Sequence, residues 1–302
     1  MTDLFSIFAS DVLPIFVIAG AGFALARWLK TSAATLTHVV FYLLLPCFAF
    51  RLLISTVATG RQFGQMVLLA VLVVLAMAVV GGLVSVMLRL NRAEATVFLL
   101  VVMFSNGGNY GLPVVSFAFG EEALSYGTVF FLTGSVLTNT LGAFLAAAGR
   151  RSLRTAAASV LRMPAIYGIV AALLVLATGT SVPTPLLRPV TMLSDAALPL
   201  MILVLGMRLE RAPAPTRPVL VAAAVCVSLL IAPLVALGLT SLLHVTGAAR
   251  QAVVVLSSMP VAVATTILAL EFDASPDFVT SAVFFSTLLS PLTLTPLIAY
   301  LR

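Results

Sequence analysis

The chain has 302 residues, of which 62% are hydrophobic and only 9% are charged. Soluble domains carry about 25% charged residues, so a soluble protein of this size is excluded. The net charge of +6 does not indicate nucleic-acid binding, because the arginines fall in short clusters between apolar runs, as in cytoplasmic loops of membrane proteins. Cys47 and Cys226 lie within apolar runs without disulfide or metal spacing and are expected to be small core residues.

Charged residues divide the chain into ten apolar stretches, numbered here as spans 1 to 10. Most are long enough for a membrane helix of about 20 residues, and they are apolar on all sides, which favours helices over barrel strands. The sequence therefore predicts an all-α integral membrane protein with ten transmembrane helices. The spans cover roughly residues 12–26, 31–50, 62–88, 95–120, 123–149, 163–187, 189–207, 218–249, 251–270 and 278–301.

Lysine and arginine predict the orientation of these spans, because cytoplasmic loops carry an excess of both. One set of alternate loops holds Arg27, Lys30, Arg89, Arg92, Arg150, Arg151, Arg154, Arg162, Arg208, Arg211 and Arg217. The other set holds Arg51, Arg61, Arg188, Arg250 and Arg302. The first set is expected to be cytoplasmic, which makes the chain a multi-pass protein of the inner (cell) membrane with both termini outside the cytoplasm. The acidic loop 271–277 is an exception of small weight, since Asp and Glu contribute little to this rule.

The prolines indicate an internal repeat. The basic segment 150–163 separates five spans from five more, and prolines recur in matching spans on its two sides. The pairs, at offsets of 150, 153 and 147 residues, are Pro14 with Pro164, Pro46 with Pro199, and Pro113 with Pro260. Prolines are common in membrane helices, so one pair alone means little. Three pairs in the same order predict two five-helix repeats, 1–150 and 151–302, and an odd number of spans inverts the second.

Span 4 is interrupted by residues that disfavour a helix, in the stretch "VMFSNGGNYGLPVVSFAFG" at 102–120. A backbone group left unpaired in lipid costs several kcal/mol, so such a break is expected inside the protein or beside a water-filled cavity. Span 9 has "SSMPVAVATT" at the corresponding depth. Interrupted helices in paired positions of inverted halves indicate a transport site, and their half-helix N-termini favour an anion.

The polar side chains at the two breaks are the candidate substrate ligands. Asn106 and Asn109 offer uncharged donors, with Gly108 between them, and the hydroxyl candidates are Ser105, Ser258 and Thr265. A phosphate loop is a poor reading of this stretch, because the Lys-Ser/Thr pair is missing. Gly107 and Gly111 also form a GxxxG pair that lets helices pack closely, and this structural reading stands beside the functional one.

Asp195, in "TMLSDAALPLM", is the acidic residue expected to lie within a span, where a carboxylate is a functional candidate. It is a possible site of proton coupling, or alternatively it caps the outer start of span 7. Arg51 is expected at the membrane interface, within reach of Asp195 if the two halves pack face to face. His38 and His244 are expected to be interface residues. Motifs of hydrolases and metalloenzymes are missing, so we expect neither an enzyme nor a metal or cofactor site.

The sequence resembles the auxin efflux carrier family of membrane transporters, in its bacterial form. The resemblance is carried by "FYLLLPCFAFRLL", "FSNGGNYGLPVVSFAFGEEAL", "AALPLMILVLGMRLE" and "MPVAVATTILALEFDASPDFVTSAVFFSTLLSPLTLTPL". It implies two inverted five-helix repeats, similar to bile acid sodium symporters and NhaA-like antiporters. Spans 1, 2, 6 and 7 would form a scaffold, and spans 3–5 and 8–10 a transport unit in which helices 4 and 9 cross at their breaks. Pro113 and Pro260 match the family's crossover prolines, and Asn106 and Asn109 fall in its polar motif.

The same resemblance implies a secondary carrier for small organic anions, such as auxin, malate or malonate, and a possible homodimer through spans 2 and 7. The partners expected are thus the substrate, the lipid bilayer and a second copy of the chain. The crossover contains no Asp or Glu, so sodium coupling is expected less than proton coupling, and uniport driven by the membrane potential is a further option. The alternative function is a channel-like or sensory membrane protein without coupled transport.

Overall fold

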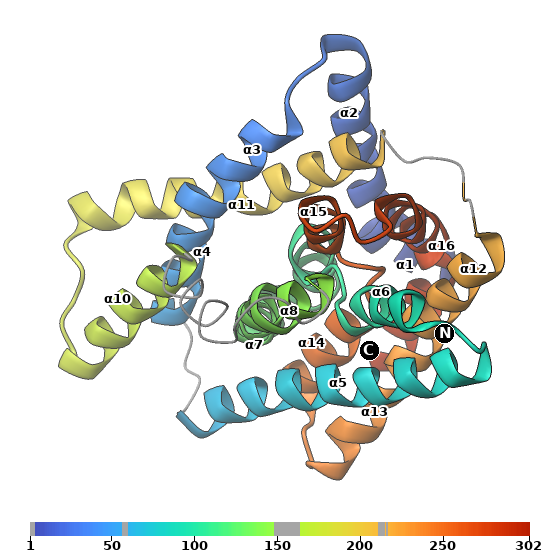
Figure 1. The fold of residues 1–302 in the computed structure, drawn as a ribbon. Helices are drawn as coiled ribbons and strands as arrows, with labels where there is room; N and C mark the ends of the chain where they lie inside the picture. Colours follow the sequence, from blue (N-terminus) through green and yellow to red (C-terminus); the bar gives the residue numbers. More distant parts are fainter. Residues whose placement is uncertain (1–3, 56–59, 148–163, 211–214, 216) are drawn as a thin grey trace.

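The computed structural model describes residues 4–55, 60–147, 164–210, 215 and 217–302, and every regular element in these ranges is a helix (Figure 1). Five short π-helical turns, labelled η, lie within longer helices of this described part. The elements are α1 (Leu4–Ile7), η1 (Phe8–Val12), α2 (Leu13–Leu29), α3 (Ala33–Val39), η2 (Val40–Leu44), α4 (Leu45–Ser55), α5 (Gly60–Met87), α6 (Arg92–Met103), η3 (Gly107–Gly111), α7 (Leu112–Leu137), η4 (Thr138–Gly142), α8 (Ala143–Ala146), α10 (Pro164–Thr178), α11 (Thr184–Leu209), α12 (Pro218–Cys226), η5 (Val227–Ile231), α13 (Ala232–Leu242), α14 (Gly247–Ser257), α15 (Val263–Glu271) and α16 (Pro276–Leu301).

Seven helical stretches of the described chain are long and apolar enough to cross a membrane. They are Leu4–Leu29, Ala33–Ser55, Gly60–Met87, Gly107–Ala146, Thr184–Leu209, Pro218–Leu242 and Pro276–Leu301. Large apolar side chains on their outer faces, such as Val79, Leu83 and Leu292, are more than half exposed, as expected of a surface that meets lipid. The prediction of an all-α, multi-pass membrane protein is therefore confirmed, whereas length and composition alone give seven spans and not the expected ten.

Two of the expected span boundaries are wrong. We expected Arg188 and Arg250 to lie in loops, but Arg188 lies inside α11 and Arg250 inside α14. The connection between α10 and α11 lies earlier than Arg188, where Gly179 adopts a positive φ of 64° and Pro183 precedes α11. A long arginine side chain can reach the interface from within a helix, so a charge is a poorer boundary signal than turn residues. The basic segment 150–163, on which the division into repeats rests, lies outside the described residues.

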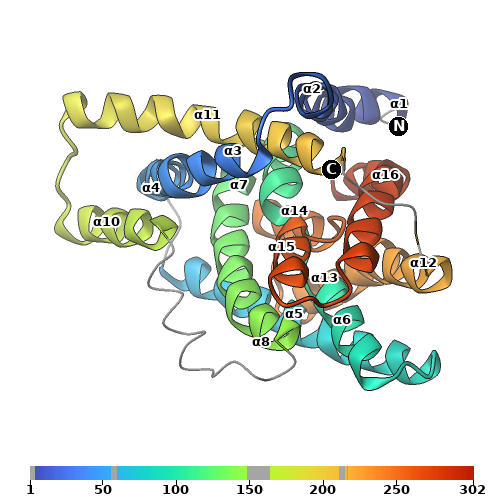
Figure 2. The same ribbon diagram turned by 45° about the horizontal axis from the view of Figure 1, so that its top comes forward.

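The helices α2 and α4 each pack closely along a helix of the second half, α2 along α11 and α4 along α10 (Figure 2). Glycines permit this approach. A Cβ on Gly22 would lie 2.1 Å from the carbonyl oxygen of Leu203, and one on Gly168 would lie 2.3 Å from that of Pro46. We call these four helices, with α1, η1, α3 and η2, the scaffold, and α5–α8 with α12–α16 the transport unit, which are the names that the family resemblance gives to these spans.

Gly22 provides a direct test of the α2–α11 contact. Gly22→Ala is expected to destabilise the protein by about 1–3 kcal/mol, because the new methyl group meets backbone that cannot move aside. Gly20→Ala is the matched control, two residues away on the same helix, where a Cβ meets nothing within 4 Å. Thermal unfolding in detergent checks this difference. Equal midpoints for the two variants would contradict the packing described here.

Candidate functional site

Two helices of the transport unit are interrupted. The first interruption runs from Phe104 to Asn106, between α6 and η3, with the glycine-rich turn following it. Pro113 follows this turn as the second residue of α7. The second interruption separates the end of α14 at Ser257 from the start of α15 at Val263, and it contains Pro260. Both breaks thus fall in the stretches that the sequence singled out.

The two breaks cross and satisfy each other's backbone groups. An antiparallel bridge joins Ser105 and Val261. The amide N–H of Asn106 donates to the carbonyl of Pro260 at 2.7 Å, and that of Ala262 donates to the carbonyl of Phe104 at 2.9 Å. These backbone groups have no partner within their own helices, and an unpaired group is costly inside a membrane. Each break therefore supplies hydrogen-bond partners for the backbone groups of the other.

Hydroxyl groups complete the crossing. The Ser105 Oγ donates to the carbonyl of Leu256 at 2.8 Å, and the Ser286 Oγ accepts from the N–H of Val261 at 3.1 Å. Ser258 and Thr265 instead donate to carbonyls of their own segments, Val254 and Ala262. The crossing is therefore a rigid, hydrogen-bonded junction from which both helices restart.

A cavity of about 450 Å³ lies against this junction. The residues at which both helices restart line it: Gly107, Gly108 and Asn109 on one side, and Ala262, Val263 and Ala264 on the other. The first N–H groups of a helix have no partner within it, and they carry the positive end of the helix dipole. Two such ends at one cavity make it favourable for an anion.

Asn106 supplies a second, independent sign of a ligand. Its side chain is only 4% exposed and lines the cavity, yet its Nδ2 has no hydrogen-bond partner among the described residues. Buried amide groups are almost always hydrogen-bonded, because an unmade bond costs about 1–3 kcal/mol. This unmade bond makes Asn106 a candidate ligand-binding residue in the cavity wall.

The structure brings together some of the predicted site residues and not others. Ser105, Asn106, Gly108 and Asn109 line the cavity. Pro113, Ser258, Pro260 and Thr265 are buried outside its lining, where Pro260 contributes its carbonyl to the crossing.

Asp195 also lies outside the cavity lining, and the expectation that it caps the start of span 7 is wrong. It lies well inside α11, which begins at Thr184, and its side chain is 59% exposed. Its Oδ1 is 2.8 Å from the Arg51 Nη1, which confirms that these two residues approach each other. In place of Asp195, the buried carboxylate of the described chain is Asp11, which is 3% exposed.

Sequence reasoning missed a second group of polar residues in the cavity wall. Ser135, Thr138 and Asn139 from the end of α7 and from η4 line it, as do Thr37 and Arg208 from the scaffold. The Arg208 Nη2 donates to the Thr37 Oγ1 at 3.3 Å. Asn139 was detectable as an amide inside an apolar run, whereas Arg208 was counted only as a loop cation. Aromatic rings of Phe41, Phe104, Phe130 and Phe131 supply apolar wall.

The described residues contain no group of three or more His, Cys, Asp or Glu side chains that could hold a metal ion. The charged and titratable side chains in the cavity lining include His38, Arg208 and Glu271. The wall is otherwise made of amides, hydroxyls, backbone and apolar groups, which suits a small amphipathic solute better than a hydrated metal ion.

An all-helical membrane protein whose two interrupted helices meet at a polar cavity has the architecture of a membrane transporter. Comparison with known proteins agrees: residues 7–298 match the model of a family described as membrane transport protein. The chain belongs to this family, the auxin efflux carrier-like one to which its motifs pointed. It is also similar to an uncharacterized transporter of Methanocaldococcus jannaschii, with 27% identity over 86% of this chain and 87% of the relative. A second uncharacterized transporter, from Methanothermobacter thermautotrophicus, is 29% identical over 86% of each chain.

Proposed function

We propose that this protein is a secondary carrier that moves small organic anions, mono- or dicarboxylates of the auxin, malate or malonate kind, by alternating access. The observation that carries the proposal is the unpartnered, buried Nδ2 of Asn106 at a cavity where two helix N-termini converge. The donors at the crossing are uncharged, so they stabilise a carboxylate without holding it too tightly to be released. The same wall also contains the charged side chains of Arg208 and Glu271. The apolar rings in the same wall suit the carbon skeleton.

We also propose the finer architecture on which alternating access depends, ten spans in two inverted repeats. Two observations favour it. Gly22 of span 1 lies close to Leu203 of span 7, and Gly168 of span 6 lies close to Pro46 of span 2. In two inverted repeats, spans 1 and 2 of the first half correspond to spans 6 and 7 of the second, so these two contacts are equivalent. Gly120, with non-helical φ of 78° and ψ of −166°, divides α7 into the end of one span and the start of the next. In this proposal both termini lie outside the cytoplasm of a cell whose inner membrane holds the protein.

Uptake into proteoliposomes tests the carrier function. The purified protein is expected to give saturable uptake of at least one member of a panel of radiolabelled mono- and dicarboxylates, because a carrier binds its substrate at a limited number of sites. Imposed proton, sodium and potential gradients then separate proton coupling, for which Asp195 is the candidate, from sodium coupling and uniport. Single-channel currents, or ligand binding without flux, would instead support a channel-like or sensory protein.

A further inference from the structure

The turn at Gly120 is held from two sides by arginines. Gly120 has a positive φ of 78°, and a Cβ built on it would meet nothing within 4 Å, so one side of the turn is open. The carbonyl of Ala118, just before it, accepts a hydrogen bond from Arg302. The carboxylate of Glu121, just after it, pairs with Arg51. Both arginines also pair with an aspartate of the scaffold.

Asp11 and Arg302 form the stronger of these contacts. The Arg302 Nη2 lies 2.6 Å from the Asp11 Oδ2 and 3.3 Å from the Ala118 carbonyl oxygen. The Ser10 hydroxyl donates to the other Asp11 oxygen at 2.8 Å. Asp11 belongs to η1 of the scaffold, whereas Arg302 directly follows α16 of the transport unit. Because the Asp11 side chain is only 4% exposed, its charge depends on this partner.

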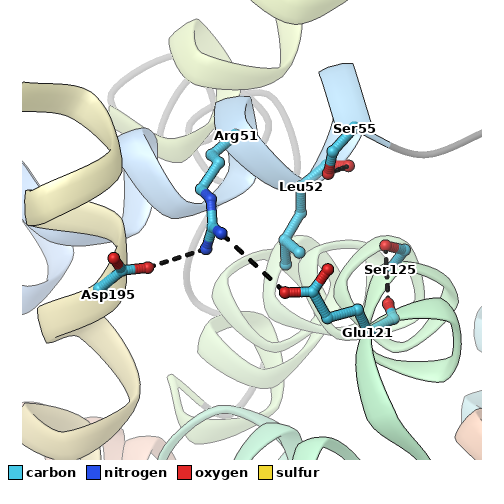
Figure 3. Close-up of polar contacts among 6 residues, drawn as sticks. All are labelled: Arg51, Leu52, Ser55, Glu121, Ser125 and Asp195. Carbon is cyan, nitrogen blue, oxygen red and sulfur yellow. Dashed lines mark hydrogen bonds and ion pairs between the residues drawn. The ribbon is translucent and has the colours of Figure 1, made fainter. Parts of the chain in front are cut away.

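Arg51 forms the second contact (Figure 3). Its Nη1 lies 2.8 Å from the Asp195 Oδ1, which ties α4 to α11 within the scaffold. Its Nη2 reaches across to the Glu121 Oε1 at 3.9 Å, an ion pair longer than a hydrogen bond. The Glu121 side chain is 82% exposed, so solvent screens this pair and it is easily broken.

These contacts lie on the opposite side of the crossing from the cavity. Asp195 and Arg208 both belong to α11, and their separation of 13 positions corresponds to about 20 Å along the helix. Asp195 is paired beside the Gly120 turn, whereas Arg208 lines the cavity. On the turn's side of the crossing, the fully buried ring of Tyr110 packs edge-on against Phe16 of the scaffold, with the ring centres 6.0 Å apart. One side of the crossing is therefore packed and the other is hollow.

We propose that the ion pairs Asp11–Arg302 and Arg51–Glu121 form a latch that holds the transport unit against the scaffold on the packed side. The inference rests on the proposed alternating access, in which the packed side must open while the cavity side closes. Both pairs join the two bodies at the Gly120 turn, and both must separate if the turn moves away from the scaffold. Asp11 in the first pair is buried, whereas Glu121 in the second is exposed to solvent, so the second pair is expected to separate first.

Labelling of a buried cysteine tests the latch without using any substrate. Val12 of η1 is fully buried, and η1 packs against α7 and α16 of the transport unit. Val12→Cys is introduced into a chain whose Cys47 and Cys226 are replaced by alanine, and a polar maleimide is applied in nanodiscs, where both faces are reached. Combining Asp11→Asn, Arg302→Gln and Glu121→Gln breaks both latch pairs, leaves no unpaired carboxylate at position 11, and leaves Arg51 paired with Asp195. This combination is expected to raise the labelling rate about tenfold or more.

Two further variants keep the test decisive. Glu121→Lys changes one exposed residue, so the fold is retained, and like charges facing Arg51 are also expected to accelerate labelling. Glu122→Gln is the matched control at the adjacent exposed carboxylate and is expected to leave the rate unchanged. Unchanged labelling in the latch variants overturns the proposal, even where the protein transports carboxylates. Faster labelling in a protein that transports none supports the latch and rejects the carrier function.

Discussion

Asn106→Ala is expected to reduce carboxylate uptake by about tenfold or more while leaving the protein folded. A hydrogen bond to a charged group contributes about 1.5–3 kcal/mol, and about 1.4 kcal/mol corresponds to a factor of ten in affinity. The Asn106 Nδ2 has no protein partner among the described residues, so its removal breaks no bond within the crossing. The backbone N–H that donates to Pro260 remains.

The measurement is the initial uptake rate of the preferred carboxylate in proteoliposomes, with thermal unfolding measured in parallel. Ser194→Ala is the control, because the Ser194 hydroxyl is likewise buried and unpartnered among the described residues but does not line the cavity. Its uptake should match that of the unaltered protein. If Asn106→Ala and Asn109→Ala both transport normally, the carboxylate binds elsewhere.

Ala264→Asp is expected to abolish uptake almost completely. Ala264 lies in the first turn of α15 and lines the cavity, so an aspartate there places a tethered carboxylate at the helix N-terminus proposed to receive the substrate. Two like charges about 5 Å apart repel by about 3 kcal/mol at an effective dielectric constant of about 20, which lowers affinity about 100-fold.

Ala264→Asn separates charge from size in this experiment. The two side chains have almost the same shape, so the asparagine variant should retain much more uptake than the aspartate variant. The comparison is read as substrate affinity at several carboxylate concentrations. Similar losses in both variants would mean that the site is blocked by volume, and that the helix N-terminus does not select the anion by its charge.

The interrupted helices were predictable from sequence because glycine, proline and asparagine act locally. The stretch 102–120 cannot remain a regular helix, and the chain does leave helical geometry at Phe104–Asn106. The partner of each broken backbone group was not predictable, because it comes from the opposite half of the chain. The same holds for the cavity wall, where Thr37 and Arg208 take part only because α3 and α11 pack together.

The positions of charged residues predicted the ends of the helices poorly. Asp11 was taken as the boundary of an apolar run, yet it is buried against Arg302 at the other end of the sequence. Arg188 was placed in a loop, although the turn chemistry of Gly179 and Pro183 lies several residues earlier. In each case the position of a charge depends on a long-range partner or on a flexible side chain, neither of which a local pattern contains.

The crossing of the two breaks also constrains the order of folding. The Ser105 hydroxyl and the carbonyl that it binds, that of Leu256, are 151 residues apart in the sequence. At about 5–20 residues per second, a ribosome needs about 8–30 s to make the intervening chain. During that time the Phe104 carbonyl and the Asn106 N–H lack the partners that they have in the folded protein, Ala262 and Pro260. The hydrogen bonds of the crossing form only after the second half has been made.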